Sequence, residues 1–277
     1  MIYLGLSIVA STIILLLFRW MRGAGVNSRI AIAINYFFAS ATGFILFDHA
    51  PELWNEPWFW PAAAEGIFFY AVFRLIAKTT QTSGVAAASI ATKMSVVIPI
   101  VIGLFFLDES FTTLKLSGIA LGLVAVILSS FTEGVKNWKW PLLAFVCTGI
   151  IDSSLKLFQV WTVSEPEFPS LITVIFSFAF LTGIVHHFTF TDRAISTKNF
   201  LSGMALGLVN FGSLLFLLWA LDEPNWESST VFPINNVGVV TMSSILAIVL
   251  FKEKPQLRTV AGIFLAIVAI LLLFLSS

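Results

Sequence analysis

The chain has 277 residues, 58% of them hydrophobic and 11% charged, with 15 basic and 15 acidic side chains. Soluble domains average roughly 45–50% apolar and about 25% charged residues, so this composition excludes an ordinary soluble domain. Formal neutrality, with basic residues scattered over short connections, also argues against a nucleic-acid-binding protein.

Apolar segments recur along the chain, and each is long enough, at about 17–24 residues, to cross a membrane as a helix. In chain order they cover residues 2–18, 29–47, 58–78, 84–106, 114–130, 140–161, 169–187, 199–221, 228–251 and 259–275. The first lacks a basic flank and an evident cleavage site, so we interpret it as a spanning helix. Membrane barrel strands would be shorter and alternating. We therefore predict an all-α integral membrane protein with ten transmembrane helices.

The connections between these segments fall into two sets when they are taken alternately. One set carries 12 Lys and Arg residues and 3 acidic residues, and the other carries 1 basic and 10 acidic residues. Loops rich in Lys and Arg stay in the cytoplasm. We therefore expect the first set to face the cytoplasm and both termini to face outward, in a bacterial inner membrane. All nine Trp residues lie near predicted helix ends, which is typical of a membrane interface.

Two parts of the sequence are similar to each other. LSGIALGLVAVIL (116–128) aligns with TVAGIFLAIVAILL (259–272) at an offset of 144, and Glu109 falls on Glu253. Each half holds an odd number of predicted helices, so the second half enters the membrane with opposite polarity. We predict two inverted five-helix repeats, residues 1–138 and 139–277. Secondary transporters are commonly built this way, with the substrate site between the halves.

Two longer blocks resemble a known family. They read SIATKMSVVIPIVIGLFFLDESFTTLKLSGIALGLVAVIL and STVFPINNVGVVTMSSILAIVLFKEKPQLRTVAGIFLAIVAIL. Each resembles the EamA domain of the drug/metabolite transporter superfamily. The resemblance implies a ten-helix transporter for amino acids, sugars, nucleotide sugars, organic phosphates or drugs. Many ten-helix members are drawn with both termini in the cytoplasm, whereas the charge distribution here places them outside.

A few polar residues lie inside the predicted helices, where polar groups normally face a cavity or one another. Lys93 is about 14 Å along its helix from Gly84, near the midplane of a core about 30 Å thick. Asn236 aligns with Thr92, next to Pro233 and Gly238. The predicted substrate-binding residues are Ser89, Thr92, Lys93, Asn235, Asn236, Asn210 and Tyr70. The predicted charge network is Glu65, Asp152 and Lys156.

Structural roles for the same residues stay open. Asp152 and Lys156, one turn apart, could neutralise each other, and Lys93 could be the partner of Asp152 or Glu65. Asn235 and Asn236 could bond only neighbouring helices. Glu65 is close enough to the interface to reach water among the headgroups.

We expect a secondary active transporter that moves a small metabolite by alternating access. An amino acid or another small organic solute fits, with its carboxylate on Lys93. Coupling to protons through Asp152 is expected, because burial favours a neutral carboxyl group; facilitated exchange is the alternative. The partners are the substrate and the lipid bilayer, with no cofactor, metal or nucleic acid. A monomer suffices for this activity, and a dimer is an alternative.

Three other functions remain to be separated from this one. An exporter of lipophilic cations would use Glu65 or Asp152 as counter-ion and aromatic side chains as a cage. An intramembrane enzyme needs a nucleophile and base or a metal set at one depth. The three His residues lie near helix ends and no HExxH occurs, so we do not expect an enzyme. An assembly subunit without transport activity is the third alternative.

Overall fold

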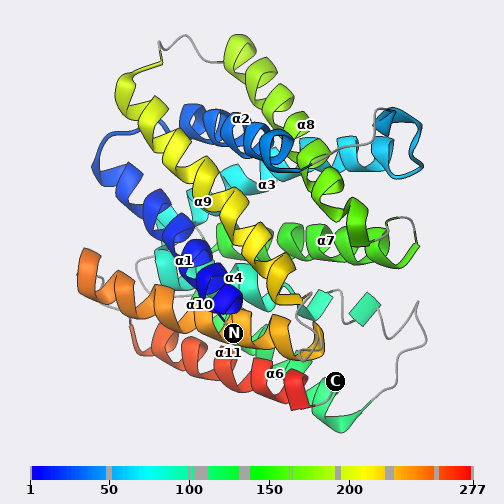
Figure 1. The fold of residues 1–277 in the computed structure, drawn as a ribbon. Helices are drawn as coiled ribbons and strands as arrows, with labels where there is room; N and C mark the ends of the chain where they lie inside the picture. Colours follow the sequence, from blue (N-terminus) through cyan, green and yellow to red (C-terminus); the bar gives the residue numbers. More distant parts are fainter. Residues whose placement is uncertain are drawn as a thin grey trace. The chain divides into compact units, whose positions relative to one another are not determined.

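A computed structural model describes residues 2–47, 52–98, 101–102, 112–130, 138–161, 163, 165–190, 195–221, 228–252 and 256–275. This part of the chain is helical throughout, without a strand (Figure 1). The α-helices are α1 (Ile2–Gly23), α2 (Ser28–Leu46), α3 (Phe59–Ser83), α4 (Val85–Met94), α6 (Thr113–Ser130), α7 (Lys139–Trp161), α8 (Phe168–Phe190), α9 (Thr197–Leu221), α10 (Ser228–Phe251) and α11 (Leu257–Leu275). Two short 3₁₀ helices, η1 (Leu53–Asn55) and η2 (Glu165–Glu167), precede α3 and α8.

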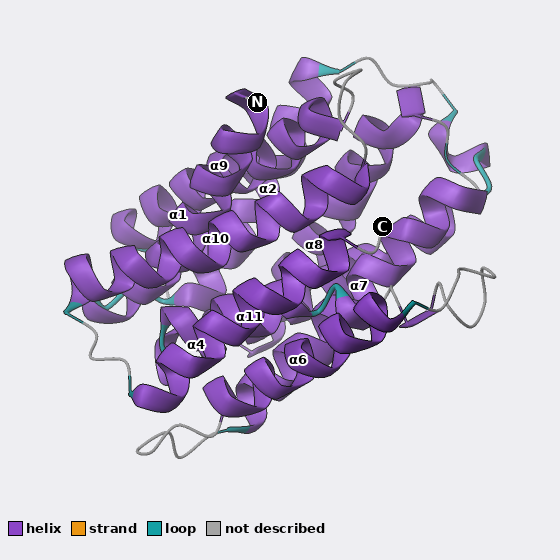
Figure 2. Cartoon of the chain, turned by 90° about the horizontal axis from the view of Figure 1, so that it is seen from below, coloured by secondary structure: helices purple, strands orange, loops and turns teal. Residues whose placement is uncertain are grey.

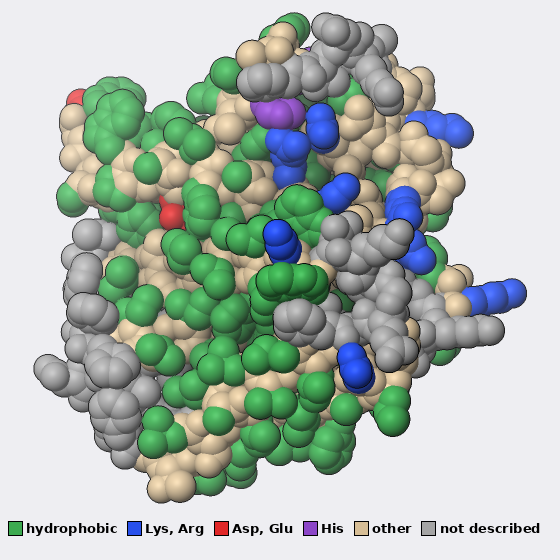
Figure 3. All heavy atoms as spheres, turned by 180° about the vertical axis from the view of Figure 1, so that it is seen from behind, with side chains coloured by type: hydrophobic (Ala, Val, Ile, Leu, Met, Phe, Trp, Pro, Cys, Tyr) green, Lys and Arg blue, Asp and Glu red, His purple; other side chains and the backbone are tan. Residues whose placement is uncertain are grey.

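The described helices are those of a multi-pass membrane protein. Six of them, α1, α2, α3, α8, α9 and α10, contain segments long and apolar enough to cross a membrane, while α4, α6 and α11 have shorter apolar stretches. Helices suit this setting because all their backbone bonds are made within the segment. Large apolar side chains such as Ile45, Phe188 and Val249 face outward, and hydrophobic side chains dominate the face in Figure 3.

Nine of the ten predicted segments correspond to one described helix each, with ends that differ by at most five residues. The largest differences are at the ends of α1 and α3, where the helix continues beyond the apolar run. In α3 the hydroxyls of Thr79 and Thr80 donate to the carbonyls of Leu75 and Ile76, which keeps this polar end helical. Hydropathy therefore marks the apolar length of a helix and not its last helical residue.

The predicted segment 84–106 is not one unbroken helix. Helix α4 ends at Met94, a turn follows at Ser95 and Val96, and residues 97–98 and 101–102 are helical again. Pro99, which lies outside the described residues, has no N–H to donate to the Ser95 carbonyl. That carbonyl instead accepts from the Ile98 N–H at 2.9 Å. The Ser95 hydroxyl also donates to the Thr92 carbonyl at 2.6 Å, which closes the last turn of α4.

By their contacts the helices form two compact units. Unit 1 contains residues 1–19, 75–153 and 213–277, and unit 2 contains residues 20–74 and 154–212. Each unit takes segments from both halves of the sequence. The two units are therefore a different division from the two sequence repeats, and the repeat boundary at residue 138 stays a prediction.

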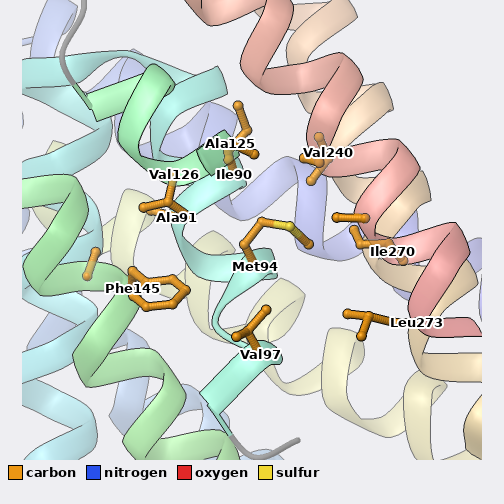
Figure 4. Packing of buried hydrophobic residues seen from close by; sticks show 13 residues of the cluster. Ile90, Ala91, Met94, Val97, Ala125, Val126, Phe145, Val240, Ile270 and Leu273 are labelled. Atoms are coloured by element: carbon orange, nitrogen blue, oxygen red, sulfur yellow. The ribbon is translucent and has the colours of Figure 1, made fainter. Parts of the chain in front are cut away.

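In unit 1, α6 packs along α11, α10 contacts α11 and α4, and α4 also contacts α6 (Figure 2). Their shared core is apolar and contains Met94 and Val97 beside Ala125, Ile270 and Leu273 (Figure 4). Helix α4 begins at Gly84, whose φ of 92° is strained for any residue with a side chain. This glycine also ends α3: its N–H still donates to the Thr80 carbonyl, but its positive φ turns the chain out of the helix.

In unit 2, α2 packs along α8. Helix α9 also approaches α2 closely, since a Cβ at Gly207 would lie 2.5 Å from the Asn35 carbonyl oxygen. The start of α2 is fixed by Asn27, whose side chain accepts from the Arg29 N–H and whose own N–H donates to Asn199 Oδ1 at 3.0 Å. Close packing in this unit thus depends on small residues, as is usual between membrane helices.

Candidate functional site

Many hydroxyl groups in the described helices are satisfied by their own helix. Thr42, Thr79, Thr80, Thr82, Ser153, Thr173, Ser177, Thr182 and Thr189 each donate to the carbonyl four residues earlier. Such bonds satisfy a hydroxyl in an apolar surrounding without any partner from another helix. Buried polar groups that lack them are therefore candidates for a ligand site.

We single out three buried polar atoms of this kind in unit 1. Two are hydroxyl oxygens close to a charged residue in the sequence, and the third belongs to Asn235 on α10. Ser89 is fully buried and Asn235 is 3% exposed. Ser89 Oγ, Asn235 Oδ1 and Thr148 Oγ1 make no hydrogen bond within the described structure. Ser89 and Thr148 each precede a charged residue, Lys93 and Asp152, by four positions and so share its helix face. Other buried hydroxyls without a bond, on Thr12, Ser83, Thr241 and Ser244, have no charged residue within one turn along the chain.

The carboxylate of Asp152 on α7 is linked to α4. Ser95 Oγ donates to Asp152 Oδ2 at 2.7 Å, and Lys93 interacts electrostatically with the same carboxylate. A hydroxyl has a single proton, yet Ser95 Oγ faces two acceptors, Asp152 Oδ2 and the Thr92 carbonyl. The two acceptors therefore compete for one proton as long as the carboxylate is ionised.

Asn235 and Asn236 lie on α10, which packs against α4. Val239 joins Val85 and Ala88 in one apolar cluster, and Val240 joins Ile90 and Met94 in another. Asn236 precedes these two valines by three and four residues, so it lies on the face of α10 turned to α4. Both asparagines are buried. The polar groups of α4, α7 and α10 form what we call the α4 cluster: Ser89, Thr92, Lys93, Ser95, Thr148, Asp152, Asn235 and Asn236.

The four other predicted site residues belong to unit 2. Asn210 on α9 donates from Nδ2 to Asn35 Oδ1 at 3.2 Å, within that unit. Tyr70 on α3 is buried, and its ring lies 5.9 Å from the ring of His186. Glu65 on α3 is buried as well. Lys156 lies on α7, but its side chain is outside what the structure describes.

The sequence did not reveal Ser95 and Thr148 as members of the α4 cluster. Ser95 follows Lys93 by two residues, and Thr148 precedes Asp152 by one turn. Hydroxyl residues are common in apolar helices, so only the bond to Asp152 and the lack of a bond at Thr148 distinguish these two. The described residues hold no group of three or more His, Cys, Asp or Glu side chains that could bind a metal ion.

The interaction of Lys93 with Asp152 leads to a prediction about stability. We expect Lys93→Met and Asp152→Asn each to lower the melting temperature of the purified protein, because each leaves a charge without its partner. The double variant should lose less than the sum of the two. Differential scanning fluorimetry in detergent measures this coupling, which we expect to be about 0.5 kcal/mol or more for two charges that interact.

A matched pair provides the control. Lys78, in the same unit, lies 5.9 Å from the centre of the Trp140 ring. Lys78→Met combined with Asp152→Asn should give additive changes. Additive changes for Lys93 and Asp152 would contradict the pairing.

Comparison with known proteins gives a fold but no function. No protein-family model matches the chain. An uncharacterized protein of Haemophilus influenzae (strain ATCC 51907 / DSM 11121 / KW20 / Rd) is 25% identical over 286 residues, which cover 97% of this chain and 96% of that protein. A protein of known crystal structure has a TM-score of 0.63 and 14% identity, over 98% of this chain and 94% of that chain. Similarity at this level of identity concerns the fold alone.

Proposed function

We propose that the protein is a secondary transporter that moves a small metabolite across the membrane by alternating access. The observation that carries the proposal is the α4 cluster, a set of buried and half-buried polar side chains in one unit. A cation, a carboxylate, two amides and two hydroxyl groups without a bond exceed what apolar helix packing requires. Ionisable residues within membrane helices typically mark a substrate or ion pathway.

The break in α4 supports this proposal. Helix α4 has 10 residues and so is about 15 Å long, half of a core about 30 Å thick. Lys93 lies in its last turn, where the negative end of the helix dipole favours a cation. Substrate and ion sites of secondary transporters are commonly formed at the ends of such discontinuous helices.

The proposed architecture is ten transmembrane helices in two inverted five-helix repeats, as in the EamA-like transporters that the sequence resembles. Three helix contacts within the units support it. The contacts of α4 with α10, of α6 with α11 and of α2 with α8 each join a helix to its predicted counterpart in the other half. Counterpart helices meet in this way when they lie close to a pseudo-two-fold axis.

The chemistry of the α4 cluster fits a zwitterionic solute. The ammonium group of Lys93 can bind a substrate carboxylate, and the amide oxygen of Asn235 can accept from a substrate ammonium group. Ser89 supplies a further hydroxyl on the Lys93 face of α4. An amino acid is therefore the substrate class that the cluster fits best.

The interaction between Lys93 and Asp152 suggests how protons are coupled to transport. A substrate carboxylate that binds Lys93 replaces Asp152 as the partner of the cation. Asp152, half-buried and now without a counter-charge, takes up a proton. Its carboxyl group then donates to Ser95 Oγ, which leaves the Ser95 proton for the Thr92 carbonyl. Binding of one carboxylate is thereby matched by uptake of one proton.

The first test is flux of radiolabelled amino acids in liposomes that contain only the purified protein. The wild type should transport an amino acid but not the amine that lacks its carboxylate. Lys93→Ala should lower flux about tenfold or more, because a charge-assisted hydrogen bond to the substrate is lost. Lys78→Ala should transport like the wild type.

Wild-type flux by Lys93→Ala would refute the carboxylate site. Transport of quaternary ammonium compounds in place of amino acids would identify an exporter of lipophilic cations instead. If the purified wild type transports nothing from either class, the protein is not a transporter of this kind.

Proton coupling is tested in the same liposomes with a pH gradient. Asp152→Asn cannot take up a proton, so the gradient should no longer drive substrate accumulation. Exchange of labelled for unlabelled substrate at equal pH should continue, because Lys93 and the amides remain. Gradient-driven accumulation that is unchanged in Asp152→Asn would exclude Asp152 as the proton carrier.

The proposed topology places both termini outside a bacterial inner membrane. Asn55 and Lys198 are exposed and are separated by five predicted helices, so they should lie on opposite sides. In a Cys147→Ser background, Asn55→Cys should react with a membrane-impermeant maleimide in intact cells. Lys198→Cys should react only after permeabilisation. Reaction of both from the same side would contradict the count of ten helices.

A further inference from the structure

A second polar cluster lies in unit 2, apart from the groups used above. Arg74 on α3 and His186 on α8 are joined by a hydrogen bond of 2.9 Å between Nη1 and Nε2. The Arg74 guanidinium also lies over the Tyr70 ring, 5.8 Å from its centre. Arg29, in the first turn of α2, acts electrostatically on both Tyr70 and His186. We call Arg29, Arg74, His186 and Tyr70 the basic cluster.

The hydrogen bond defines the donors of this cluster. A guanidinium can only donate, so His186 Nε2 accepts and its proton is on Nδ1. Arg74 has five N–H donors arranged as a planar fork, and the bond to His186 needs only one of them. Donors from Arg29, Arg74 and His186 thus belong to one small region, in which two permanent cations act on the same two rings.

Tyr70 is an independent indication that this region accommodates a ligand. Its side chain is 3% exposed, and its hydroxyl approaches the Arg74 guanidinium without making a hydrogen bond of good geometry to it or to any other described group. Arg74 and Arg29 are nevertheless close enough to act on that hydroxyl. A buried hydroxyl group beside two guanidinium groups is suited to donate to an anion that they hold.

The position of Arg29 points to the sign of the ligand. The N-terminus of a helix is the positive end of its dipole, where a cation is unfavourable and an anion is favourable. Arg29 occupies the first turn of α2, which holds no acidic residue. Basic side chains also lie beside a histidine on the face shown in Figure 3. A bound anion would offset this concentration of positive charge.

We propose that the basic cluster binds a phosphate group, with Arg74 and Arg29 as the charged donors and His186 and Tyr70 as neutral donors. Forked guanidinium donors match the oxygen atoms of a phosphate. Arg74 and His186 are half-buried and Arg29 is exposed, so a group from outside the helices can reach them. The phosphate comes from an anionic phospholipid headgroup or from free phosphate. Basic sites between membrane helices commonly hold such headgroups.

The site is tested with the full-length protein purified in detergent. One arm adds dioleoylphosphatidic acid, a second adds inorganic phosphate, and a third adds dioleoylglycerol, which has the same chains without the phosphate. A ligand that binds only the folded protein raises its melting temperature in a saturable way. We expect this from at least one phosphate-bearing probe and not from dioleoylglycerol. Stabilisation by phosphatidic acid alone identifies a lipid, and stabilisation by inorganic phosphate identifies the free anion.

Variants connect the effect to the cluster. Arg74→Gln should weaken the apparent affinity about tenfold, as expected for the loss of a charge-assisted bond. Tyr70→Phe, which removes only the buried hydroxyl, should weaken it severalfold. Lys198→Gln removes one exposed positive charge on α9 and should change nothing. Arg29→Gln, at an exposed position, provides the same test if Arg74→Gln does not fold.

Two results would overturn the proposal. One is the absence of saturable stabilisation by both phosphatidic acid and inorganic phosphate. The other is a loss of affinity in the control variant Lys198→Gln that equals the loss in Arg74→Gln or Arg29→Gln. Such a result would indicate unspecific attraction to positive charge. Neither result depends on transport, so the site and the proposed function can fail separately.

Discussion

The need to satisfy every polar group without water governs this structure. In the described part of the chain it makes the backbone helical. It also applies to side chains, since many hydroxyl groups of the described helices donate back into their own helix, as Thr173 does to Pro169 and Thr182 to Phe178. Buried polar groups that make no such bond within their own helix therefore indicate candidate ligand sites. Ser89, Thr148 and Asn235 in unit 1, and Tyr70 in unit 2, are buried without a hydrogen bond of good geometry.

The need to satisfy polar groups without water also bears on the charge balance of the two clusters, which differs between them. In the α4 cluster a cation and a carboxylate balance each other, so the region is polar but nearly neutral. In the basic cluster, two arginines act on the same histidine and tyrosine. A balanced cluster suits a solute that must bind and leave again. An unbalanced one suits a group that stays and supplies the missing charge.

Much of the fold was predictable because a membrane helix leaves a strong pattern. Hydropathy predicted nine helices to within a few residues. The end of α4 at Met94 was not predicted, because it depends on the Ser95 hydroxyl and on the bond from Ile98 to the Ser95 carbonyl. Hydropathy does not depend on either bond.

The candidate site was predictable only in part. Charges in apolar helices are rare, so Lys93 and Asp152 were evident, and in the structure they are near enough to act on each other electrostatically. Ser95 and Thr148 were missed because hydroxyl residues are common in such helices and their role depends on the neighbour they reach. Arg29, Arg74 and His186 were interpreted only as signs of topology or of the interface. Their association depends on α2, α3 and α8 meeting in unit 2, which a single sequence does not reveal.

Gly84 fixes the rotational phase of α4. Its φ of 92° and ψ of 165° belong to a region that is essentially restricted to glycine. The chain leaves this residue directly into α4, and Lys93 lies nine residues further on. A helix turns by about 100° per residue, so a shift of α4 by one position would point Lys93 away from Asp152. The angular position of the central cation is thus set more than two turns away, by a residue with no side chain.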